Sequence, residues 1–546
     1  MSIRLRLTLI VLALVLAGLP LLGPPSARAE KVMVPMRDGV KLATDFYVPA
    51  EGGPSFPVVV ARSVYGRGKG PTDSNVRRHT ENGYAFVIQD TRGRGESEGK
   101  DLCFADDGWG ERQDGADTIA WVAQQPWSNG KIGTWGGSAL GITQVMMGPA
   151  TRKVTCQSIV VAASDFYGQL AYQGGVFRKS LCEGWLTAQK IPYIIDEWHS
   201  HPTYDDFWKL HNAELQAAQV TAPAIHFGGW WDIFNQGTIN NFTSRQYHGG
   251  EGAKGNQKLV MGAWIHGPKK HPGDLEMRDN FGFDMDKYAN RLYEYWLKGV
   301  DNGIMKEPPV QYYTVGDVFD EKAPGNEWRT AQDWPPFPTT ETAYYLAEGG
   351  ALSTAPATAA EAKLTYAYDP NDPCPTVGGA ELLLPAGPFD QQPKLSTRQD
   401  VLTFMTGPLE KPLEITGNVK ARLFVSTDAP DTDFTAKLLD VYPDGKQILM
   451  LDSIRRLKFR NGYEKTEPLE PNKVGEIVID LWSISLILNA GHRIGVQVSS
   501  SNFPRFEKNP NTGADLPTGE LRVAHNSVYV DATHPSAISL PVREGK

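Results

Sequence analysis

Hydrophobic residues between about positions 32 and 298 are grouped in short continuous runs. Such runs are typical of strands that are buried on both faces. They occupy residues 56–61, 84–88, 159–162, 224–227 and 259–262. A helix-compatible stretch at residues 111–125, ended by Pro126, lies between two of these runs. Strands separated by helices predict an α/β fold with a mostly parallel sheet that helices cover on both sides.

A different pattern begins at about residue 308, where apolar residues alternate with others as in strands that have one buried face. The alternation marks residues 419–425, 475–481 and 493–499. A Pro-Asp-Gly sequence at 443–445 predicts a tight turn between two strands. We therefore predict an α/β domain over residues 30–307 and an all-β, jelly-roll-like sandwich over residues 308–546. Residues 351–362, rich in Ala and Thr, are expected to form a surface loop.

A long insertion, at about residues 165–219, separates two of the predicted strands. It is rich in Tyr, Trp and Leu and has no strong strand signal. We expect it to form a helical cap over the carboxyl edge of the sheet. Ligands bind at that edge in open α/β folds, so the cap would cover a binding site.

The N-terminal residues 1–29 have the pattern of a secretory signal peptide. Arg4 and Arg6 precede an apolar run, and Ala27 and Ala29 form a small-x-small cleavage site. The prediction is an exported protein, periplasmic or extracellular, whose mature chain starts at Glu30. An uncleaved membrane anchor is the weaker alternative because the apolar run is short for a spanning helix. We expect no stable membrane insertion, since no later segment is apolar for long enough.

The chain has a formal net charge of −9, and removal of the leader with its three arginines would make it more negative. An acidic chain without basic runs argues against nucleic acid as a partner. The four cysteines are too widely spaced for a zinc ribbon or a Cys-x-x-Cys redox motif. The sequence does not decide between free thiols and disulfides. It also leaves the oligomeric state open, including assembly into a homo-oligomer.

One segment carries a clear chemical signal. A strand-like run at residues 131–135 leads into Gly-Gly-Ser-Ala-Leu-Gly at 136–141, and a helix-compatible stretch follows at 142–147. An α/β-hydrolase presents its nucleophilic serine on this kind of strand–turn–helix, where the flanking residues must be small. The alternative for Ser138 is an incidental serine in a glycine-rich turn, because such turns are common.

A serine nucleophile needs a base and an acid that orients the base, and in α/β-hydrolases the chain order is Ser, acid, His. Asp232 follows the predicted strand at 224–227, and His266 follows the strand at 259–262. In a parallel sheet both would lie at the same edge as Ser138. His226 falls inside a predicted strand and is interpreted as a core residue.

Several further motifs give the chain a resemblance to a known family. They are RDGVKL at 37–42, QDTRGRGESEG at 89–99, DGW at 107–109, WSNGKIG at 127–133, GHR at 491–493 and SNFPR at 501–505. The chain resembles the cocaine esterase and Xaa-Pro dipeptidyl-peptidase-like family of α/β-hydrolases, which includes α-amino acid ester hydrolases and glutaryl-cephalosporin acylases. The likeness spans essentially the whole mature chain.

The resemblance implies roles for particular residues. Ser138, Asp232 and His266 fall on the family triad. Tyr65 falls on a tyrosine whose hydroxyl, together with the backbone N–H of Ala139, forms the oxyanion hole. The alternative for Tyr65 is a packed aromatic after a strand. Arg92, Arg94 and Glu96 lie in the motif at 89–99, the most distinctive of the set. They are expected to anchor a loop through ion pairs.

Two departures from the family pattern affect the expected substrate. Ala139 replaces an aromatic residue that often follows the serine, which predicts a wider acyl pocket. Ile233, Phe234 and Asn235 follow Asp232, where amino-acid ester hydrolases carry acidic residues that hold the substrate ammonium. Without those carboxylates an ammonium would lose hydration and gain no counter-ion, so neutral acyl groups are expected. Phe234 is a candidate wall of the acyl pocket, with core packing as its alternative.

The predicted function is hydrolysis of a carboxylic ester, or secondarily an amide, of a small molecule through an acyl-enzyme. This chemistry needs no metal or organic cofactor. The nearest alternative is an Xaa-Pro dipeptidyl-peptidase or β-lactam (cephalosporin) acylase on the same scaffold. An alternative of another class is a non-catalytic carbohydrate-binding protein that uses the β sandwich.

Overall fold

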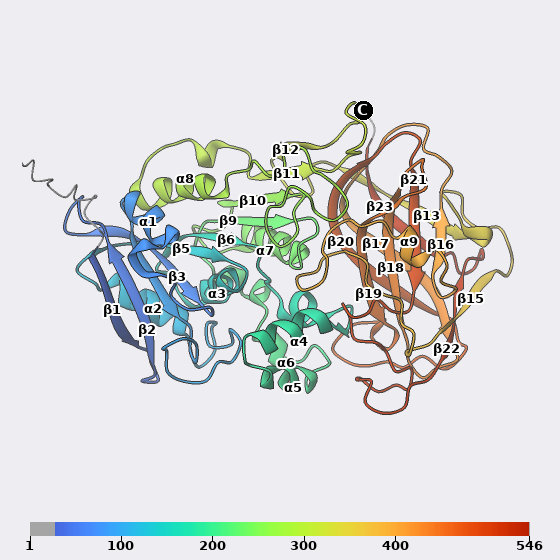
Figure 1. Cartoon of the computed structure of the whole chain (residues 1–546), viewed down its shortest axis with the longest axis horizontal. Helices are drawn as coiled ribbons and strands as arrows, with labels where there is room; N and C mark the ends of the chain where they lie inside the picture. The colour runs from blue at the N-terminus through green and yellow to red at the C-terminus, as the bar shows by residue number, and fades with distance from the viewer. Residues whose placement is uncertain (1–27, 545–546) are drawn as a thin grey trace, which may run out of the picture.

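The computed structural model describes residues 28–544 and arranges them in an α/β part and a β part that lie side by side (Figure 1). The predicted signal peptide falls outside the described residues except for Arg28 and Ala29, which begin strand β1. A mixed, largely parallel sheet in the first part and a mostly antiparallel sheet in the second confirm the predicted fold class.

The first sheet has ten strands in the order β1-β2-β4-β3-β5-β6-β9-β10-β11-β12. Its central strands, from β4 to β11, are parallel, and antiparallel strands flank them at both edges. The strands are β1 (Arg28–Pro35), β2 (Lys41–Val48), β3 (Phe56–Ser63), β4 (Ala85–Asp90), β5 (Ser128–Gly137), β6 (Val154–Val160), β9 (Ala224–Gly229), β10 (Gln257–Gly262), β11 (Val310–Thr314) and β12 (Glu327–Ala331). The sheet therefore extends past residue 307, where the sequence predicts a domain boundary.

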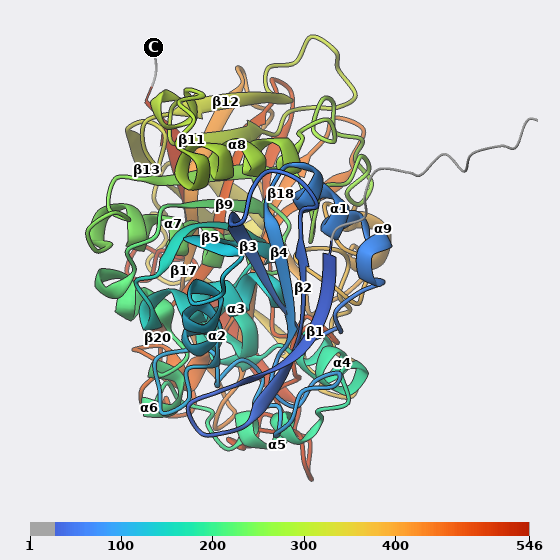
Figure 2. The ribbon, with the colours of Figure 1, turned by 90° about the vertical axis from the view of Figure 1, so that its left-hand side faces the viewer.

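Helices cover both faces of this sheet, which explains why its strands are continuously apolar. They are α1 (Ser74–Glu81), α2 (Asp114–Ala123), α3 (Ala139–Met147), α7 (Asn235–His248) and α8 (Met285–Lys298). Val59 of β3 packs with α1 and α8, whereas its neighbours Val58 and Val60 pack with α2 and α3 on the opposite face. Figure 2 shows α8 on one side of β5 and both α2 and α3 on the other.

The insertion after β6 is mainly helical. It contains the π-helical turn η3 (Tyr167–Ala171), α4 (Lys179–Ala188), α5 (Tyr193–His199), α6 (Asp206–Lys209) and the 3-10 segment η4 (Ala213–Gln219). A hairpin of β7 (Tyr172–Gln173) and β8 (Val176–Phe177) interrupts it, which the sequence did not indicate because each strand is only two residues long. In Figure 1, α4, α5 and α6 lie between the two parts.

The β part has eleven strands, ordered β15-β22-β17-β23-β13-β14-β16-β21-β18-β19, with β20 paired to β17. They are β13 (Thr339–Ala347), β14 (Ala351–Ser353), β15 (Lys363–Tyr368), β16 (Leu402–Met405), β17 (Leu413–Thr427), β18 (Asp433–Val441), β19 (Gln447–Arg456), β20 (Gly475–Leu488), β21 (Arg493–Ser499), β22 (Ala524–Tyr529) and β23 (Ala537–Arg543). The loop predicted at 351–362 is wrong in its first residues, because β14 pairs there with β13.

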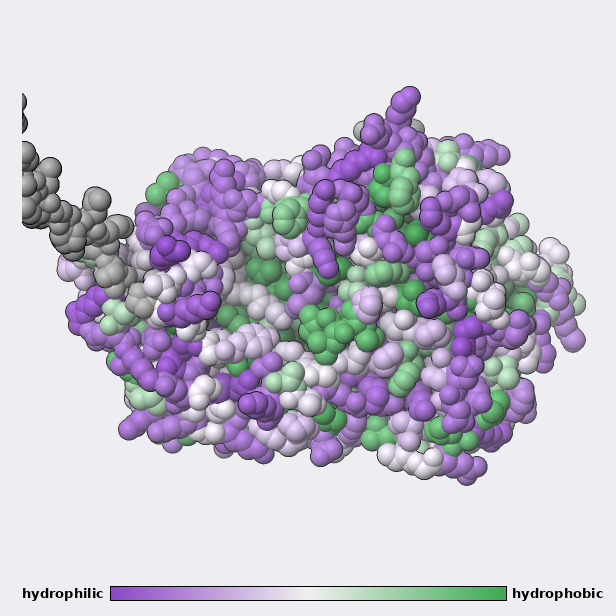
Figure 3. All heavy atoms as spheres, in the orientation of Figure 1, coloured by the Kyte–Doolittle hydropathy of each residue, from purple (hydrophilic) through white to green (hydrophobic). Residues whose placement is uncertain are grey.

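On the face shown in Figure 3, polar residues dominate the surface, and an apolar cluster is exposed between the two parts. Within residues 28–544, no helix is long and apolar enough to cross a membrane. One large core, built mainly from the β part, also includes Trp230, Trp231 and Met261 of the α/β part. The two parts therefore share buried apolar contacts next to the carboxyl edge of the first sheet.

Candidate active site

Ser138 lies at the sharp turn between β5 and α3. Its φ of 56° and ψ of −124° place it in a region that residues with a side chain seldom adopt. Its N–H donates to the Val160 carbonyl of the neighbouring strand β6, at 2.9 Å, which ties the turn to the sheet. The turn therefore has the strained geometry of a nucleophile elbow.

The glycines beside Ser138 are required by this turn. A Cβ at Gly136 would lie 2.4 Å from Leu140 Cβ, closer than real contacts allow. A Cβ at Gly141 would lie 2.9 Å from both Ala162 Cβ and the Val160 oxygen. The expectation that the neighbours must be small is thus confirmed by the spacing of the atoms.

Ser138, His266 and Asp232 form one hydrogen-bonded chain at the carboxyl edge of the sheet. His266 Nε2 lies 2.7 Å from Ser138 Oγ, and His266 Nδ1 lies 2.6 Å from Asp232 Oδ1. Asp232 is fully buried, and its second oxygen accepts the backbone N–H of Phe234 at 2.9 Å. The carboxylate is thus fixed on one side by the backbone and on the other by the imidazole, which it orients.

The loop that carries Asp232 is held by the β part. Trp231 Nε1 donates to the Met450 carbonyl of β19 at 3.0 Å. The Asn235 side chain donates to the Ser483 carbonyl of β20, also at 3.0 Å. Both contacts join residues more than two hundred positions apart. The sequence analysis did not predict these contacts, because no local pattern shows which backbone carbonyl a distant side chain will meet.

The loop that carries His266 is held by a buried asparagine that the sequence analysis also missed. The Asn280 carboxamide forms two hydrogen bonds with the Ala263 backbone. It accepts the Ala263 N–H and donates to the Ala263 carbonyl, each at 3.0 Å. The Asn280 carbonyl accepts the Trp264 indole N–H, again at 3.0 Å. These bonds fix the backbone two and three residues before His266 and thereby position the imidazole.

Tyr65 and Ala139, the predicted oxyanion-hole residues, lie on either side of the same edge. Ala139 is buried and begins α3, so its N–H has no acceptor one turn earlier within the helix. Tyr65 follows β3, the neighbour of β5, and its side chain is 52% exposed. The Tyr65 hydroxyl accepts the indole N–H of Trp185 at 3.2 Å, and Trp185 lines the pocket beside Ser138.

An apolar pocket opens beside Ser138. It is lined by Phe104, Ala139, Ile142, Leu170, Leu181, Cys182, Trp185, Leu186, Trp198, Ile233, Phe234 and Leu382. Half of these residues come from the cap, and Leu382 comes from the β part. Phe234 also packs edge-on against His266, with ring centroids 5.8 Å apart. Since no charged side chain lines the pocket, it is suited to an uncharged apolar group.

The pocket is narrow, with a cavity volume of about 30 Å³. The expectation that Ala139 leaves a wider pocket than an aromatic residue would leave stays a prediction. Trp185, Trp198 and Phe104, which the sequence did not assign to the pocket, fill the space around it. Cys182 also lines the pocket, and burial raises the pKa of its thiol, so it stays protonated. All four cysteines are free and buried.

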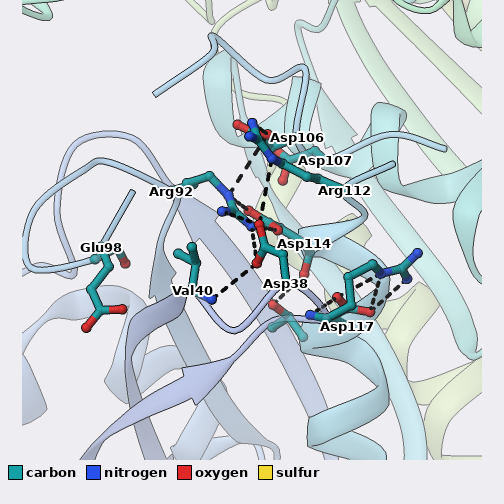
Figure 4. A network of polar contacts seen from close by, with 12 residues as sticks. Asp38, Val40, Arg92, Glu98, Asp106, Asp107, Arg112, Asp114 and Asp117 are labelled. Carbon is teal, nitrogen blue, oxygen red and sulfur yellow. Dashed lines mark hydrogen bonds and ion pairs between the residues drawn. The ribbon is translucent and has the colours of Figure 1, made fainter. Parts of the chain in front are cut away.

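The charged residues of the 89–99 motif are structural, as expected. Arg92 pairs with Asp38 and Asp114, which are brought together from separate segments (Figure 4). The hydrogen bonds that Arg92 donates to Asp114 and Asp38 raise the pKa of its guanidinium. Arg94 donates to the Val64 carbonyl at 2.9 Å and thus supports the backbone next to Tyr65.

Glu96 and His226 also have structural positions. Glu96 forms ion pairs with Arg67 and Lys31 at the surface. His226 is fully buried in β9, and burial lowers its pKa to about 3, so the ring is neutral. Its interpretation as a core residue is confirmed. It lies inside a strand and takes no part in the hydrogen-bonded chain at Ser138.

The sheet topology, the strained serine turn and the buried Asp–His–Ser chain together define an α/β hydrolase of the serine type. Comparisons with known proteins agree. The model of the X-Pro dipeptidyl-peptidase (S15) family matches residues 38–193 and 184–268. The model of the X-Pro dipeptidyl-peptidase C-terminal non-catalytic domain matches residues 302–539.

Individual relatives match over nearly the full chain. Cocaine esterase of Rhodococcus sp. (strain MB1 Bresler) is 32% identical, over 94% of this chain and 98% of that protein. An aminopeptidase from a marine sediment Thaumarchaeota archaeon superposes with a TM-score of 0.81 at 26% identity. An α-amino acid ester hydrolase superposes with a TM-score of 0.80, also at 26% identity. Both structures cover 97% of this chain and are themselves covered to 99%.

The chain belongs to the CocE/NonD, or X-Pro dipeptidyl-peptidase S15, family of serine hydrolases. The family resemblance inferred from the sequence motifs is confirmed. The protein is accordingly a serine hydrolase of the esterase and peptidase type.

Proposed function

We propose that the protein is an exported esterase that hydrolyses esters of small, neutral acyl groups through an acyl-enzyme on Ser138. The observation that carries the proposal is the uncharged, narrow pocket directly beside the Ser138–His266–Asp232 chain. A nucleophile next to such a pocket is suited to a carbonyl whose acyl side is short and apolar.

In the first half of the reaction, Ser138 Oγ attacks the ester carbonyl while His266 Nε2 takes its proton. Asp232 holds the proton on Nδ1 and stabilises the resulting imidazolium. The developing oxyanion is bound by the Ala139 N–H and the Tyr65 hydroxyl. Tyr65 is free to donate to it, because among residues 28–544 its oxygen only accepts from Trp185. Collapse expels the alcohol, which takes the proton from His266.

In the second half, His266 removes a proton from water, and the resulting hydroxide attacks the acyl carbon. The second tetrahedral intermediate uses the same oxyanion donors. Its collapse returns the proton to Ser138 Oγ and releases the carboxylic acid. Every proton transfer passes through one imidazole nitrogen, His266 Nε2, which lies 2.7 Å from Ser138 Oγ.

The acyl preference follows from charge and space. Phe234 and Ile233 line the pocket where a carboxylate would be needed to hold an α-ammonium group. A charged ammonium would be desolvated there without compensation. The cavity is small, with a volume of about 30 Å³. Short acyl groups are therefore expected to be accommodated more readily than bulky ones.

The test is a set of esters that share one leaving group and differ in the acyl part. We expect kcat/KM to fall from acetyl to butyryl to benzoyl, and phenylacetyl to exceed phenylglycyl. A phenylglycyl ester turned over as well as its phenylacetyl counterpart would contradict the proposed neutral-acyl preference. An Xaa-Pro dipeptide amide, included in the same set, would indicate a peptidase if it were the best substrate.

A further inference from the structure

A second cavity lies between the cap, α7 and the β part, and the proposed reaction does not use it. Its volume is about 280 Å³. Carboxamides of Gln169, Gln173, Gln236 and Asn240 line it. It is thus much larger and more polar than the pocket at Ser138.

Two of the residues that line it each have a buried side-chain atom without a partner. Gln173 is only 2% exposed, and its Nε2 donates to Ser453 Oγ at 3.0 Å. Within residues 28–544, Gln173 Oε1 and the buried Arg455 Nε have no hydrogen-bond partner. Leaving such atoms unpaired costs free energy, so they point to a missing partner. One atom needs a donor and the other needs an acceptor.

The two orphan atoms restrict the chemistry of that partner. An ammonium group can only donate, and a carboxylate or phosphate can only accept. A hydroxyl group does both. Tyr463 and Trp482 add aromatic surface to the same cavity, against which the C–H face of a sugar ring can pack. Across the described part of the chain, no cluster of three or more His, Cys, Asp or Glu side chains is arranged to hold a metal ion.

The charges at the cavity also favour a neutral partner. Asp165, enclosed on its wall, accepts the N–H groups of Tyr167 and Gly168. Burial and the nearby Glu214 carboxylate raise the pKa of Asp165 to about 7, so the group is partly protonated near neutral pH. Asp480, on the same wall, accepts the Asn418 side-chain N–H and the Trp482 backbone N–H, each at 2.8 Å.

We propose that this cavity is a binding site for a small, neutral, polyhydroxylated molecule, such as a monosaccharide unit. The Gln173 amide oxygen would accept from one hydroxyl of the ligand, and Arg455 Nε would donate to another. The flat rings of Tyr463 and Trp482 would contact its apolar face. The site is separate from the Ser138 pocket, with which it shares no lining residue.

The test is titration of the mature protein with glucose, galactose, xylose and glycerol by saturation-transfer NMR and calorimetry. For a ligand of this size we expect a Kd on the order of 1 mM for at least one sugar. Gln173→Leu removes the unpaired acceptor and should weaken binding at least about tenfold. Gln497→Leu is the matched control, because Gln497 is equally buried and also has an unpaired Oε1, but lies outside the cavity.

A second variant guards against a folding defect in Gln173→Leu. Arg455→Lys keeps the positive charge but removes Nε, and it should weaken sugar binding to a similar degree. The Ser138→Ala variant should bind the sugar as wild type does, which separates this site from the proposed esterase site. The proposal is overturned if none of the four probes binds. It is also overturned if ethanolamine binds in preference to them, or if binding survives both cavity substitutions.

Discussion

Ser138 combines a strained backbone with a reactive position. For a residue with a side chain, a φ of 56° costs on the order of 1–3 kcal/mol of conformational free energy. The surrounding contacts must offset this cost. The hydrogen bond to Val160 and the absence of a Cβ at Gly136 and Gly141 make the turn sterically feasible. The serine hydroxyl is thereby presented to His266 by the backbone itself rather than by a flexible loop.

Tyr65 is the residue whose role depends most on a single atom. Tyr65→Phe removes one oxyanion donor and should lower kcat by roughly 10²–10³ while KM changes little. Steady-state kinetics with an acetyl ester, combined with thermal melting, provide the measurement. Because the side chain is half exposed and its hydroxyl bonds only Trp185, the melting temperature should scarcely change. Normal turnover with reduced stability would instead assign Tyr65 to packing.

Asp165 should make stability depend on pH in a defined direction. Its pKa is raised from 3.8 to about 7 in the folded protein. As pH rises from about 4 to about 7, the unfolded state ionises while the folded state stays protonated, so wild type loses stability. Asp165→Asn removes this effect. Its melting temperature relative to wild type should therefore rise between pH 4 and 7 and then level off, and a constant difference across that range would contradict the assignment.

At the scale of elements, the loop after β9 carries the acid, Asp232, and the loop after β10 carries the base, His266. The β part holds the loop that carries Asp232. Trp231→Phe removes the indole hydrogen bond to Met450 but keeps an aromatic ring next to Asp232. We expect kcat to fall with KM nearly unchanged, and stability to fall by about 1–2 kcal/mol. Kinetics and chemical denaturation measure the two effects.

The matched control for Trp231→Phe is Trp208→Phe. Trp208 is equally buried and donates its indole N–H to the His201 carbonyl at 2.8 Å, but it lies in the cap away from Asp232. It should lose similar stability and keep a higher kcat. If both variants lost kcat equally, the β part would have no specific role in positioning Asp232.

The elements that the sequence predicts well are those with a strong local pattern. The strands β3, β4, β9 and β10 are apolar runs flanked by breakers, and α2 ends close to Pro126 as expected. The strand predicted at 159–162 instead forms the end of β6, which stops at Val160 because Val161 takes a φ of 44°. In that conformation the Val161 N–H donates to the Phe227 carbonyl of β9 at 2.7 Å, a contact that is not visible in the local sequence.

For the candidate site, too, local patterns predicted some features, and others depend on distant contacts. The chain order and strand-end positions of Ser138, Asp232 and His266 were enough to predict that these three side chains lie close together. The pocket volume was not predicted, nor were the hydrogen bonds of Asn280 with Ala263 and of Trp231 with Met450. Each depends on contacts between different segments of the chain. The roles of the triad and of Tyr65 in catalysis remain predictions.

At the scale of the whole molecule, export and folding are compatible. Cleavage after Ala29 would remove only the first two residues of β1, which are exposed. The pairs from Glu30–Phe46 to Pro35–Lys41 would still join β1 to β2. We predict that the mature protein begins at Glu30. Because the strand pairs are kept, it should melt as the full-length chain does. N-terminal sequencing of exported material decides this, and a start at Met1 would contradict the proposed export.

The central claim is that Ser138 forms the acyl-enzyme, and covalent labelling tests it most directly. The protein is treated with a fluorophosphonate, digested and analysed by mass spectrometry, with His266→Ala as the variant that lacks the base. We predict one adduct, on the peptide that contains Ser138, formed rapidly in wild type and orders of magnitude more slowly in His266→Ala. An adduct on another serine, or equal labelling of both proteins, would contradict the account.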